Sequence, residues 1–356
     1  MTNVPNTVIP GQNGAKTALI YKALGGYPQF LSADARYISG ILGGAMGFAY
    51  DITTDSCYNF LDFTLAAFIS PEHYIGQADP AEPISASFVF YKGDSLPLEK
   101  IIPGDKAWNE AFITAVQSNG DRIVTMVYDT ITLKGKLTHY NVAALHNGKT
   151  GKLICKLPPA WDVPIDGDLF GFGARADCIS GDGTVVGGHS TNPFTSGKWS
   201  LAFWDVSDPA HPIRHGLEGK QFDFGSFYGA NYDGSVLVGG SETGGIGVIV
   251  YYDKANKKFT YKTLEPLPGW DFLNLTAVSD EGFILGFCGM SLDPGTREPI
   301  VYTEETGVVK ISDFYYEYYD IDTRHLNFYT PVAISRDGYN HFGFFEDPDS
   351  YYTLPW

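Results

Sequence analysis

A short motif recurs seven times along the chain, and this repetition constrains the fold more than any other feature. Each copy is an apolar, small and polar run that ends in an acidic or amide residue, usually followed by glycine; residues 178–183, 278–282 and 333–338 are the clearest copies. The aligned turn residues are Asp34, Glu72, Asn119, Asp182, Asp233, Glu281 and Asp337, which are 38 to 63 residues apart. A self-similar period of about fifty residues is the signature of a repeat architecture. We therefore expect an array of seven similar units.

One repeat, read in detail, predicts four short strands. Residues 176–180 are expected to form a short strand, and 181–183 a Gly-Asp-Gly hairpin turn that tolerates positive φ. A β-branched second strand follows at 184–188, a third at 200–205 and an outer fourth at 213–215. Four antiparallel strands per unit, none of which can bury both faces alone, are typical of a β-propeller blade. The glycines of the second strands let neighbouring backbones approach closely.

The two ends of the chain predict how the array closes. The seventh repeat stops at Trp356 without an outer strand, whereas the chain begins with a strand-like segment, 16–24, that resembles the fourth strands. This segment is expected to complete the last blade and so remove an exposed sheet edge. The fold class is therefore all-β, a seven-bladed β-propeller of four-stranded antiparallel blades, in one domain over residues 1–356. The expected blades are approximately 29–61, 62–102, 111–157, 174–216, 228–265, 275–312, and 330–356 plus 16–24.

The repeat core resembles a known family. Its pattern, Ile-Ser-x-Asp-Gly-x-Val-Val-x-Gly followed by a loop and a segment such as Ala202-Phe203-Trp204-Asp205, is carried best by residues 178–205. This pattern is similar to the HAF repeat of bacterial extracellular proteins. The resemblance implies a β-propeller that is secreted, periplasmic or on the cell surface, and it implies no catalytic set.

Composition limits the partners. The chain has 24 Lys and Arg against 41 Asp and Glu, a net charge of −17, which argues against nucleic acid and anionic membrane surfaces because both need a basic footprint. No run of eighteen apolar residues predicts a membrane span. The first sixteen residues lack the pattern of a signal peptide, so the protein is expected either to be cytoplasmic or to have lost a targeting segment. The sequence does not determine the oligomeric state.

Aromatic residues are frequent in the connections between an outer strand and the next inner strand. These connections should emerge on one face, and aromatic rings beside carboxylates suit a sugar, because the ring packs on C–H groups while the acid accepts hydroxyl hydrogen bonds. Packing between blades is the competing explanation, and it is weakest for the two longest connections, 158–175 and 312–330. The predicted ligand-binding residues are Trp161, Asp166, Asp168, Trp270, Asp271, Tyr318 and Asp320.

No catalytic, metal or cofactor residue is assigned. The eight histidines lack the spacing of a zinc site, no nucleotide-binding glycine motif is present, and the four cysteines are expected to be buried thiols. The first hypothesis is a non-enzymatic, exported propeller that holds a glycan or a protein on its aromatic loop face. A second is a glycoside hydrolase or lyase using loop carboxylates such as Asp166 with Asp168, or Asp320 with Asp322. A third is a structural protein-interaction module.

Overall fold

The structure is a computed structural model that describes residues 7–9, 18–21, 26–42, 46–54, 56–78, 87–101, 111–133, 135–162, 173–195, 199–320, 322–324, 328–338, 340–345 and 351–355. Within these residues the only helices are α1 (Ile311–Tyr319) and the short 3-10 turns η1 (Pro193–Thr195) and η2 (Lys220–Phe222). All other regular structure is β-strand. The predicted all-β class is confirmed.

The described strands form seven antiparallel sheets, numbered here in chain order. Six sheets have four consecutive strands each. Sheet 1 contains β3 (Gly26–Leu31), β4 (Tyr37–Leu42), β5 (Met46–Asp51) and β6 (Ser56–Phe60), and sheet 2 contains β7 (Phe63–Ser70), β8 (His73–Ala78), β9 (Phe88–Tyr91) and β10 (Asp94–Pro97). Sheet 3 contains β11 (Phe112–Val116), β12 (Arg122–Leu133), β13 (Lys136–Asn147) and β14 (Leu153–Leu157), and sheet 4 contains β15 (Ala174–Ile179), β16 (Val185–Thr191), β17 (Trp199–Asp205) and β18 (Ile213–Gly216). Sheet 5 contains β19 (Gly225–Ala230), β20 (Val236–Ser241), β21 (Ile246–Asp253) and β22 (Lys258–Leu264), and sheet 6 contains β23 (Phe272–Val278), β24 (Ile284–Met290), β25 (Asp293–Thr303) and β26 (Gly307–Lys310).

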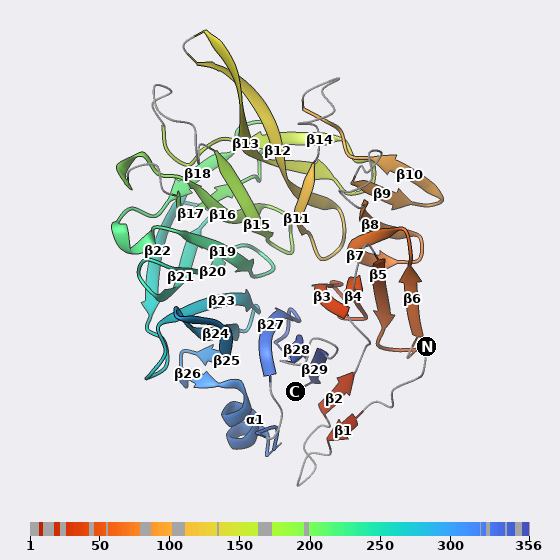
Figure 1. Cartoon of the computed structure of the whole chain (residues 1–356), viewed down its shortest axis with the longest axis vertical. Helices are drawn as coiled ribbons and strands as arrows, with labels where there is room; N and C mark the ends of the chain where they lie inside the picture. The colour runs from red at the N-terminus through yellow and green to blue at the C-terminus, as the bar shows by residue number, and fades with distance from the viewer. Residues whose placement is uncertain are drawn as a thin grey trace.

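Sheet 7 draws its strands from both ends of the chain. Its order is β1-β2-β29-β28-β27, with β27 (Phe328–Ile334), β28 (Asn340–Phe345) and β29 (Tyr351–Pro355) from the C-terminus. The N-terminus supplies β1 (Thr7–Ile9) and β2 (Ala18–Tyr21), and β2 pairs antiparallel with β29. The sheets surround a common centre, toward which their first strands lie (Figure 1). Each sheet contacts the next one, and β27 of sheet 7 contacts β3 of sheet 1.

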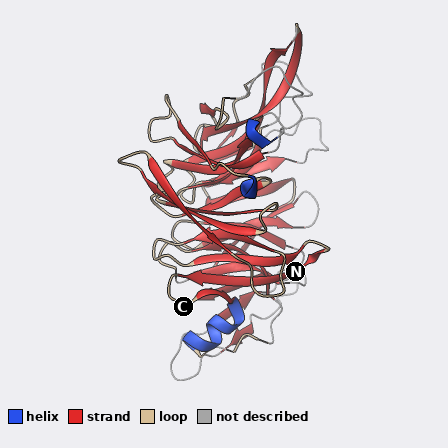
Figure 2. Ribbon diagram, turned by 90° about the vertical axis from the view of Figure 1, so that its left-hand side faces the viewer, coloured by secondary structure: helices blue, strands red, loops and turns tan. Residues whose placement is uncertain are grey.

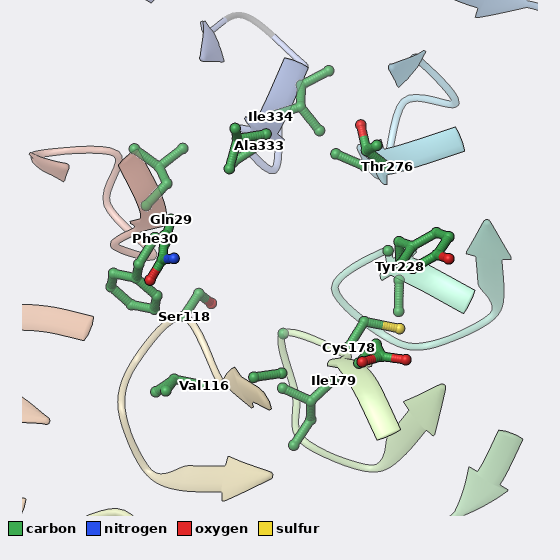
Figure 3. Close-up of a pocket in the computed structure, with 18 of the residues that line it drawn as sticks. Gln29, Phe30, Val116, Ser118, Cys178, Ile179, Tyr228, Thr276, Ala333 and Ile334 are labelled. Carbon is green, nitrogen blue, oxygen red and sulfur yellow. The ribbon is translucent and has the colours of Figure 1, made fainter. Parts of the chain in front are cut away.

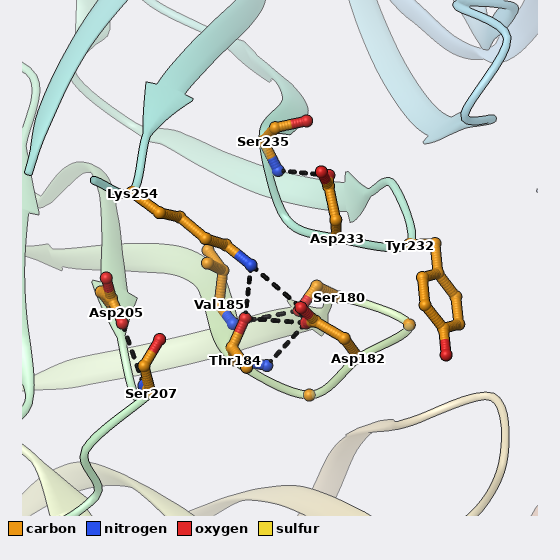
Figure 4. A network of polar contacts seen from close by, with 12 residues as sticks. Ser180, Asp182, Thr184, Val185, Asp205, Ser207, Tyr232, Asp233, Ser235 and Lys254 are labelled. Carbon is orange, nitrogen blue, oxygen red and sulfur yellow. Dashed lines mark hydrogen bonds and ion pairs between the residues drawn. The ribbon is translucent and has the colours of Figure 1, made fainter. Parts of the chain in front are cut away.

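The repeated motif forms a turn that satisfies its own polar groups (Figure 4). In sheet 4 the buried Ser180 hydroxyl donates to Asp182 Oδ1 at 2.7 Å and accepts the backbone N–H of Val185 at 3.0 Å. Asp182 Oδ1 also accepts the backbone N–H of Thr184 at 2.9 Å. Ser and Asp side chains that bond their own backbone stabilise tight turns. The same serine–aspartate bond, at 2.6 Å, joins Ser32 to Asp34 and Ser335 to Asp337.

These turns also bond to one another and so link the sheets. Asp182 N donates to the carbonyl of Tyr232 at 2.7 Å, Tyr232 N donates to Asp280 Oδ1 at 2.8 Å, and Asp280 N donates to the carbonyl of Arg336 at 2.9 Å. The turns of sheets 4 to 7 therefore lie at one end of the ring, which we call the turn face. We call the opposite end, where the first strands begin, the loop face. In the edge-on view of Figure 2 the long β12–β13 hairpin projects beyond the other strands.

Each first strand contains a residue that its neighbour cannot pair with, and β7 and β27 each contain a second one, Ile69 and Tyr329. The register shifts by one at the same place in all seven sheets, which is the mark of a β-bulge. The extra residues are Gln29, Ala66, Thr114, Asp177, Tyr228, Thr276 and Val332. The position on the second strand that faces the residue before the bulge is glycine in six sheets and Thr125 in sheet 3; the glycines are Gly40, Gly76, Gly188, Gly239, Gly286 and Gly343.

The bulge explains these glycines. A Cβ atom placed on Gly188 would lie 2.1 Å from the carbonyl oxygen of Arg175, and one on Gly239 would lie 2.1 Å from that of Ser226. No side chain fits where the bulged backbone approaches so closely. In sheets 4, 5 and 6 the bulged backbone therefore requires a second-strand glycine, whereas in sheet 2 a Cβ atom on Gly76 would meet the Phe88 ring and in sheet 3 Thr125 occupies this position.

Two local expectations were wrong. The connection expected over 312–330 begins with helix α1, whose Ile311, Phe314 and Tyr315 are buried with the spacing of one helical face. The four cysteines are free, but they are not all buried, because Cys57 is exposed and Cys155 is half-buried.

We predict that Gly188→Ala lowers the free energy of unfolding by about 1–3 kcal/mol, the usual cost of forcing extra volume into a packed site. The reason is the contact with a backbone oxygen, which cannot rotate away as a side chain can. Gly295→Ala is the matched control, since only Asp293 Oδ1, at 3.5 Å, lies near its Cβ position. Denaturant unfolding of both variants measures the difference. Equal stability of the two variants would contradict the role given to the second-strand glycine.

Asp205 closes the third strand of the repeat in sheet 4. Its buried carboxylate accepts the backbone N–H of Ser207 at 2.9 Å, the Tyr252 hydroxyl at 2.8 Å and the Lys257 ammonium at 2.7 Å. Burial alone raises the pKa of Asp205, but the bonds from Lys257, Ser207 and Tyr252 outweigh it and lower the pKa to about 2. A carboxyl group whose pKa is lower in the folded chain stabilises the fold above its unfolded pKa and loses that contribution as the pH falls.

We therefore predict that Asp205→Asn destabilises the protein by about 1–2 kcal/mol at neutral pH, since the partly exposed Lys257 is screened by solvent. The difference from the wild type should shrink as the pH falls from about 4 towards 2, where the wild-type carboxylate becomes protonated. Urea unfolding at a series of pH values measures this. A difference that is constant with pH would show that the charge of Asp205 contributes nothing.

Candidate functional site: the central cavity and the loop face

The seven first strands enclose a central cavity of about 770 Å3. Every sheet contributes to its lining, from Gln29 and Phe30 in sheet 1 to Ile334 in sheet 7. Figure 3 shows Gln29 and Tyr228 on opposite sides of the open centre, with Cys178 and Ile179 between them on the wall. All seven bulge residues lie in this lining, so the bulges determine which side chains face the cavity.

The lining changes character along the axis. The bulge residues lie nearer the loop face, and five of them are polar: Gln29, Thr114, Asp177, Tyr228 and Thr276. Two positions further along the first strands, nearer the turn face, the lining is apolar. These apolar residues are Leu31, Val116, Ile179, Ala230, Val278 and Ile334. Beyond these residues, at the turns, the lining is polar again with Ser32, Ser118, Ser335 and Arg336, so the cavity has an apolar ring between two polar ends.

A polar network lies in the wall between sheets 4 and 5. The mostly buried carboxylate of Asp177 accepts a bond from Arg175 Nε at 2.7 Å and another from the Ser226 hydroxyl at 2.7 Å. His189 Nδ1 lies 3.4 Å from Asp177 Oδ2. Burial raises the pKa of Asp177, but His189, Arg175 and Ser226 together outweigh burial and the pKa is lowered. Asp177 is therefore ionised at neutral pH.

Tyr228 stands beside this network. Burial first, and then the carboxylates of Asp177 and Glu242, raise its pKa to about 12 by disfavouring a phenolate. The phenol therefore keeps its proton and can donate a hydrogen bond. Ser226 donates its proton to Asp177 Oδ2, and His189 Nδ1 lies 3.3 Å from the same Ser226 oxygen, so hydrogen bonds hold the three side chains together. Among the described residues, no three His, Cys, Asp or Glu side chains gather as a metal site.

Trp161, a predicted ligand-binding residue, is only 9% exposed. It precedes sheet 4 and packs on the outer strand β18, where a Cβ atom on Gly216 would lie 2.2 Å from its Cζ2 atom. The neighbouring Asp162 is exposed and accepts a bond from Arg214 Nη2 at 2.5 Å. Trp161 therefore presents little of its ring to a ligand. Asp166 and Asp168 lie outside the described residues.

Trp270 and Asp271 lie on the loop face at the start of sheet 6. Trp270 is half-buried against the apolar core between sheets 5 and 6. Asp271 is exposed, and its Oδ2 atom accepts the backbone N–H of Ser291 at 2.7 Å. This adjacent pair of predicted residues leaves part of the Trp270 ring and the Asp271 carboxylate open to solvent.

Tyr318 and Asp320 lie elsewhere. Tyr318 is half-exposed on α1 and stacks on Phe314 with ring centroids 4.9 Å apart, and Asp320 ends the helix in the left-handed conformation with φ of 54°. Figure 1 places α1 on the outer rim beside β25 and β26, away from the centre. The structure therefore brings Trp270 and Asp271 together, and separates them from Tyr318 and Asp320.

The cavity lining was missed by sequence reasoning. The bulge residues stand five positions before the aligned turn residue in six repeats, as Asp177 does before Asp182 and Tyr228 before Asp233. Aligning the repeats on their turns would have placed them in one column. The residues in that column share no residue type, so only their position relative to the turn could have identified them as cavity-lining residues.

The most exposed large apolar side chains lie on the loop face, spread over several sheets. Among the described residues, four large apolar side chains are more than 60% exposed: Leu61 (71%), Leu137 (61%), Phe194 (74%) and Leu292 (97%). They belong to the connections β6–β7, β16–β17 and β24–β25 and to the tip of the β12–β13 hairpin. Because strands alternate in direction within each sheet, all four places lie at the end where first strands begin.

Comparisons with known proteins name no family. No family model and no curated protein sequence matches the chain. Among solved structures, Sqt1 of Saccharomyces cerevisiae is similar at a TM-score of 0.45 and 11% identity over 95% of this chain and 98% of that one. TolB from Acinetobacter baumannii is similar at a TM-score of 0.41 and 13% identity over 92% of this chain and 83% of that one. A putative TolB from Agrobacterium tumefaciens has a TM-score of 0.42 at 9% identity, over 99% of this chain and 98% of that one. Likenesses this distant carry no argument about function.

None of the described helices is both long enough and apolar enough to cross a membrane.

We predict that Trp161→Ala lowers the free energy of unfolding by about 3–5 kcal/mol, the usual loss for a buried tryptophan. Trp270→Ala should cost clearly less, because its ring is only half-buried. Thermal and denaturant unfolding of the two variants gives the comparison. If Trp161→Ala leaves stability unchanged, the packing of this ring on β18 does not stabilise the fold.

Proposed function

We propose that the chain is a seven-bladed β-propeller, closed by the N-terminal strand, that acts as a non-enzymatic protein-binding module through its loop face. The pairing of Leu19 with Thr353 and of Ile20 with Tyr352 supports the closure, because it adds an N-terminal strand outside β29. The contact of β27 with β3 supports a complete ring. The blades then correspond to the seven sheets within a single domain.

One observation carries the binding function: the four most exposed large apolar side chains all lie on the loop face. Protein-interaction surfaces combine apolar anchors with a polar rim, and these side chains are the candidates for such anchors. Leu61 and Leu292 offer branched aliphatic contacts. Such side chains suit the apolar anchors of another protein better than the hydroxyl-rich surface of a sugar.

A glycan is the second candidate ligand, and the pair Trp270 and Asp271 favours it. The exposed part of the Trp270 ring can pack on C–H groups of a sugar while Asp271 accepts hydroxyl bonds. We also propose that the protein is exported and belongs with the HAF-repeat propellers. The repeat core at residues 178–205 supports both points, and fractionation of the native cell checks the compartment.

The test of the loop face combines three substitutions, Leu61→Ser, Phe194→Ser and Leu292→Ser. We expect the triple variant to fold with wild-type stability, because these side chains are exposed, and to lose at least about tenfold in capture of its native partner from cell extract. A matched control carries Ile213→Ser and Tyr261→Ser, which are exposed on the outer strands of sheets 4 and 5. Capture that survives in the triple variant, or fails equally in the control, would count against the loop face.

The glycan alternative has its own test. A glycan-binding array probed with the wild type and with Trp270→Ala distinguishes the two ligand classes. Binding that is lost in Trp270→Ala would favour a sugar at sheet 6 over a protein. Absence of binding by either protein would leave the protein-binding proposal as the one to pursue.

A further inference from the structure

The central cavity holds two arginine side chains, one at each end. Arg175 is the second residue of β15, near the loop face, and Arg336 lies in the turn that follows β27, at the turn face. Their side chains are 51% and 60% exposed. Among the described residues of the lining, the only other charged one is Asp177. Two arginines against one aspartate give the cavity wall a net charge of +1, in a chain whose net charge is −17.

The way in which these two arginines are held leaves their terminal nitrogens free. Arg175 Nε donates to Asp177 Oδ1 at 2.7 Å, and Arg336 Nε donates to Asp280 Oδ2 at 2.6 Å. Neither guanidinium forms a second hydrogen bond with the part of the chain that the structure describes. The other five arginines all donate through a terminal nitrogen; they are Arg36, Arg122, Arg214, Arg297 and Arg324. The two arginines that bond through Nε alone are therefore the two that line the cavity.

A guanidinium held in this way presents its two terminal nitrogens, Nη1 and Nη2, as a fork of fixed orientation. Such a fork matches the two oxygens of a carboxylate, which it binds through two parallel hydrogen bonds. Further free groups face the cavity: the Gln29 amide and the Tyr228 hydroxyl at the height of the bulges, and the Ser118 hydroxyl at the turns (Figure 3). None of these three side chains forms a hydrogen bond within the described ranges. Both ends of the cavity therefore offer free donors, which suit a ligand rich in acceptors.

The middle of the cavity suits an alkyl chain. Val116, Ile179 and Ile334 face it and are only partly buried, and apolar surface of this kind gains free energy when an apolar group replaces the water there. In the aligned repeats Arg336 occupies the position of Gly181, six residues beyond Arg175, which is at most about 20 Å along an extended strand. The cavity volume of about 770 Å3 lies within the range of small-molecule pockets. A ligand that meets both forks is therefore elongated, with an apolar middle.

We propose that the central cavity binds a linear dicarboxylate, with one carboxylate on the fork of Arg175, the other on the fork of Arg336, and the alkyl chain against the apolar ring. Asp177 and Asp280 keep their bonds to the Nε atoms and so hold both forks in place. Binding involves no covalent step. The site goes beyond the proposed loop-face function and is independent of it, because it uses side chains that face the centre and not the outer ends of the connections.

The probes are decanedioate, dodecanedioate and tetradecanedioate, each titrated calorimetrically into the full chain. Three kinds of compound serve as comparisons: the monocarboxylate of the same chain length, the diamine of the same chain length, and succinate, which has both carboxylates but a short chain. We expect at least one long dicarboxylate to bind saturably and at least about tenfold more tightly than each comparison compound, since each of these lacks one interaction. Equal binding of any comparison compound, or no binding of any long dicarboxylate, would overturn the proposal.

Substitution of one arginine should turn the dicarboxylate into a ligand held at one end. In Arg336→Gln we expect the tightest dicarboxylate to bind about as weakly as its monocarboxylate binds to the wild type, because each complex then has one contact between a carboxylate and a fork. Arg175→Gln tests the other end. Arg175→Lys, which keeps the charge beside Asp177 but has no fork, replaces it if thermal unfolding shows that the glutamine variant does not fold. Dicarboxylate binding that is unchanged at both positions would contradict the cavity site.

Arg324→Gln is the matched control. Arg324 Nε also pairs with a carboxylate, that of Asp322 at 3.0 Å, and its guanidinium lies 3.6 Å from the centroid of the Tyr316 ring, much as Arg336 lies 3.8 Å from that of Tyr232. Arg324 contacts α1 on the outer rim and should not affect binding. A loss in Arg324→Gln equal to that in Arg336→Gln would show that the effect does not come from the cavity.

The cavity site and the loop-face function fail separately. The triple loop-face variant should bind the dicarboxylate as the wild type does. Binding that is lost in the triple variant but kept in both arginine variants would overturn the cavity site and move the ligand to the loop face. Binding that is lost in the arginine variants and kept in the triple variant supports the cavity site, whatever the outcome of partner capture.

Discussion

The contact between a bulge and a glycine is the constraint on which the rest of this structure depends. Each first strand has an extra residue at the same height, and the backbone before it approaches the second strand closely. In sheet 4 the Arg175 carbonyl leaves no room for a Cβ atom on Gly188. The bulge increases the local twist of the strand and places its extra side chain in the lining of the cavity. The same backbone defect thus shapes the sheet and selects the residues that line the centre.

Hydrogen bonds within and between the turns also link the sheets. In sheets 1, 4 and 7 serine and aspartate close the turn internally, and backbone amides of some turns bond to the next turn, as Asp182 does to Tyr232. The ring is not regular, because Ala33 N donates to the carbonyl of Ser118 and so joins sheet 1 directly to sheet 3. Sheet 2 accordingly contributes only Ala66 to the cavity lining. Its turn, which contains Glu72, is one of the two least regular copies of the repeat.

Packing accounts for much of the aromatic content of the connections. Phe222 and Phe227 are fully buried, and Trp161 lies beneath β18, so these rings fill the wedge between neighbouring sheets. Aromatic side chains suit that role because each buries a large apolar area. The side chains left exposed on the loop face are mainly aliphatic, which separates the surface available to a partner from the aromatic residues that stabilise the ring. The cavity is a third environment, with apolar side chains between two polar ends.

The sequence by itself determined the local parts of this protein: the seven turns, the four-stranded units, the glycines of the second strands and the resemblance of the N-terminal segment to an outer strand. These follow from hydrogen bonds and steric contacts between residues that are close in the chain, such as Ser180 with Asp182. Only the tertiary structure decided that Trp161 is buried while Leu292 is exposed, that Asp177 and Tyr228 line one cavity, and that a tyrosine-rich segment forms helix α1 on the rim. Burial depends on where the next sheet lies, and that position is set by contacts between residues some fifty positions apart, which no local pattern encodes.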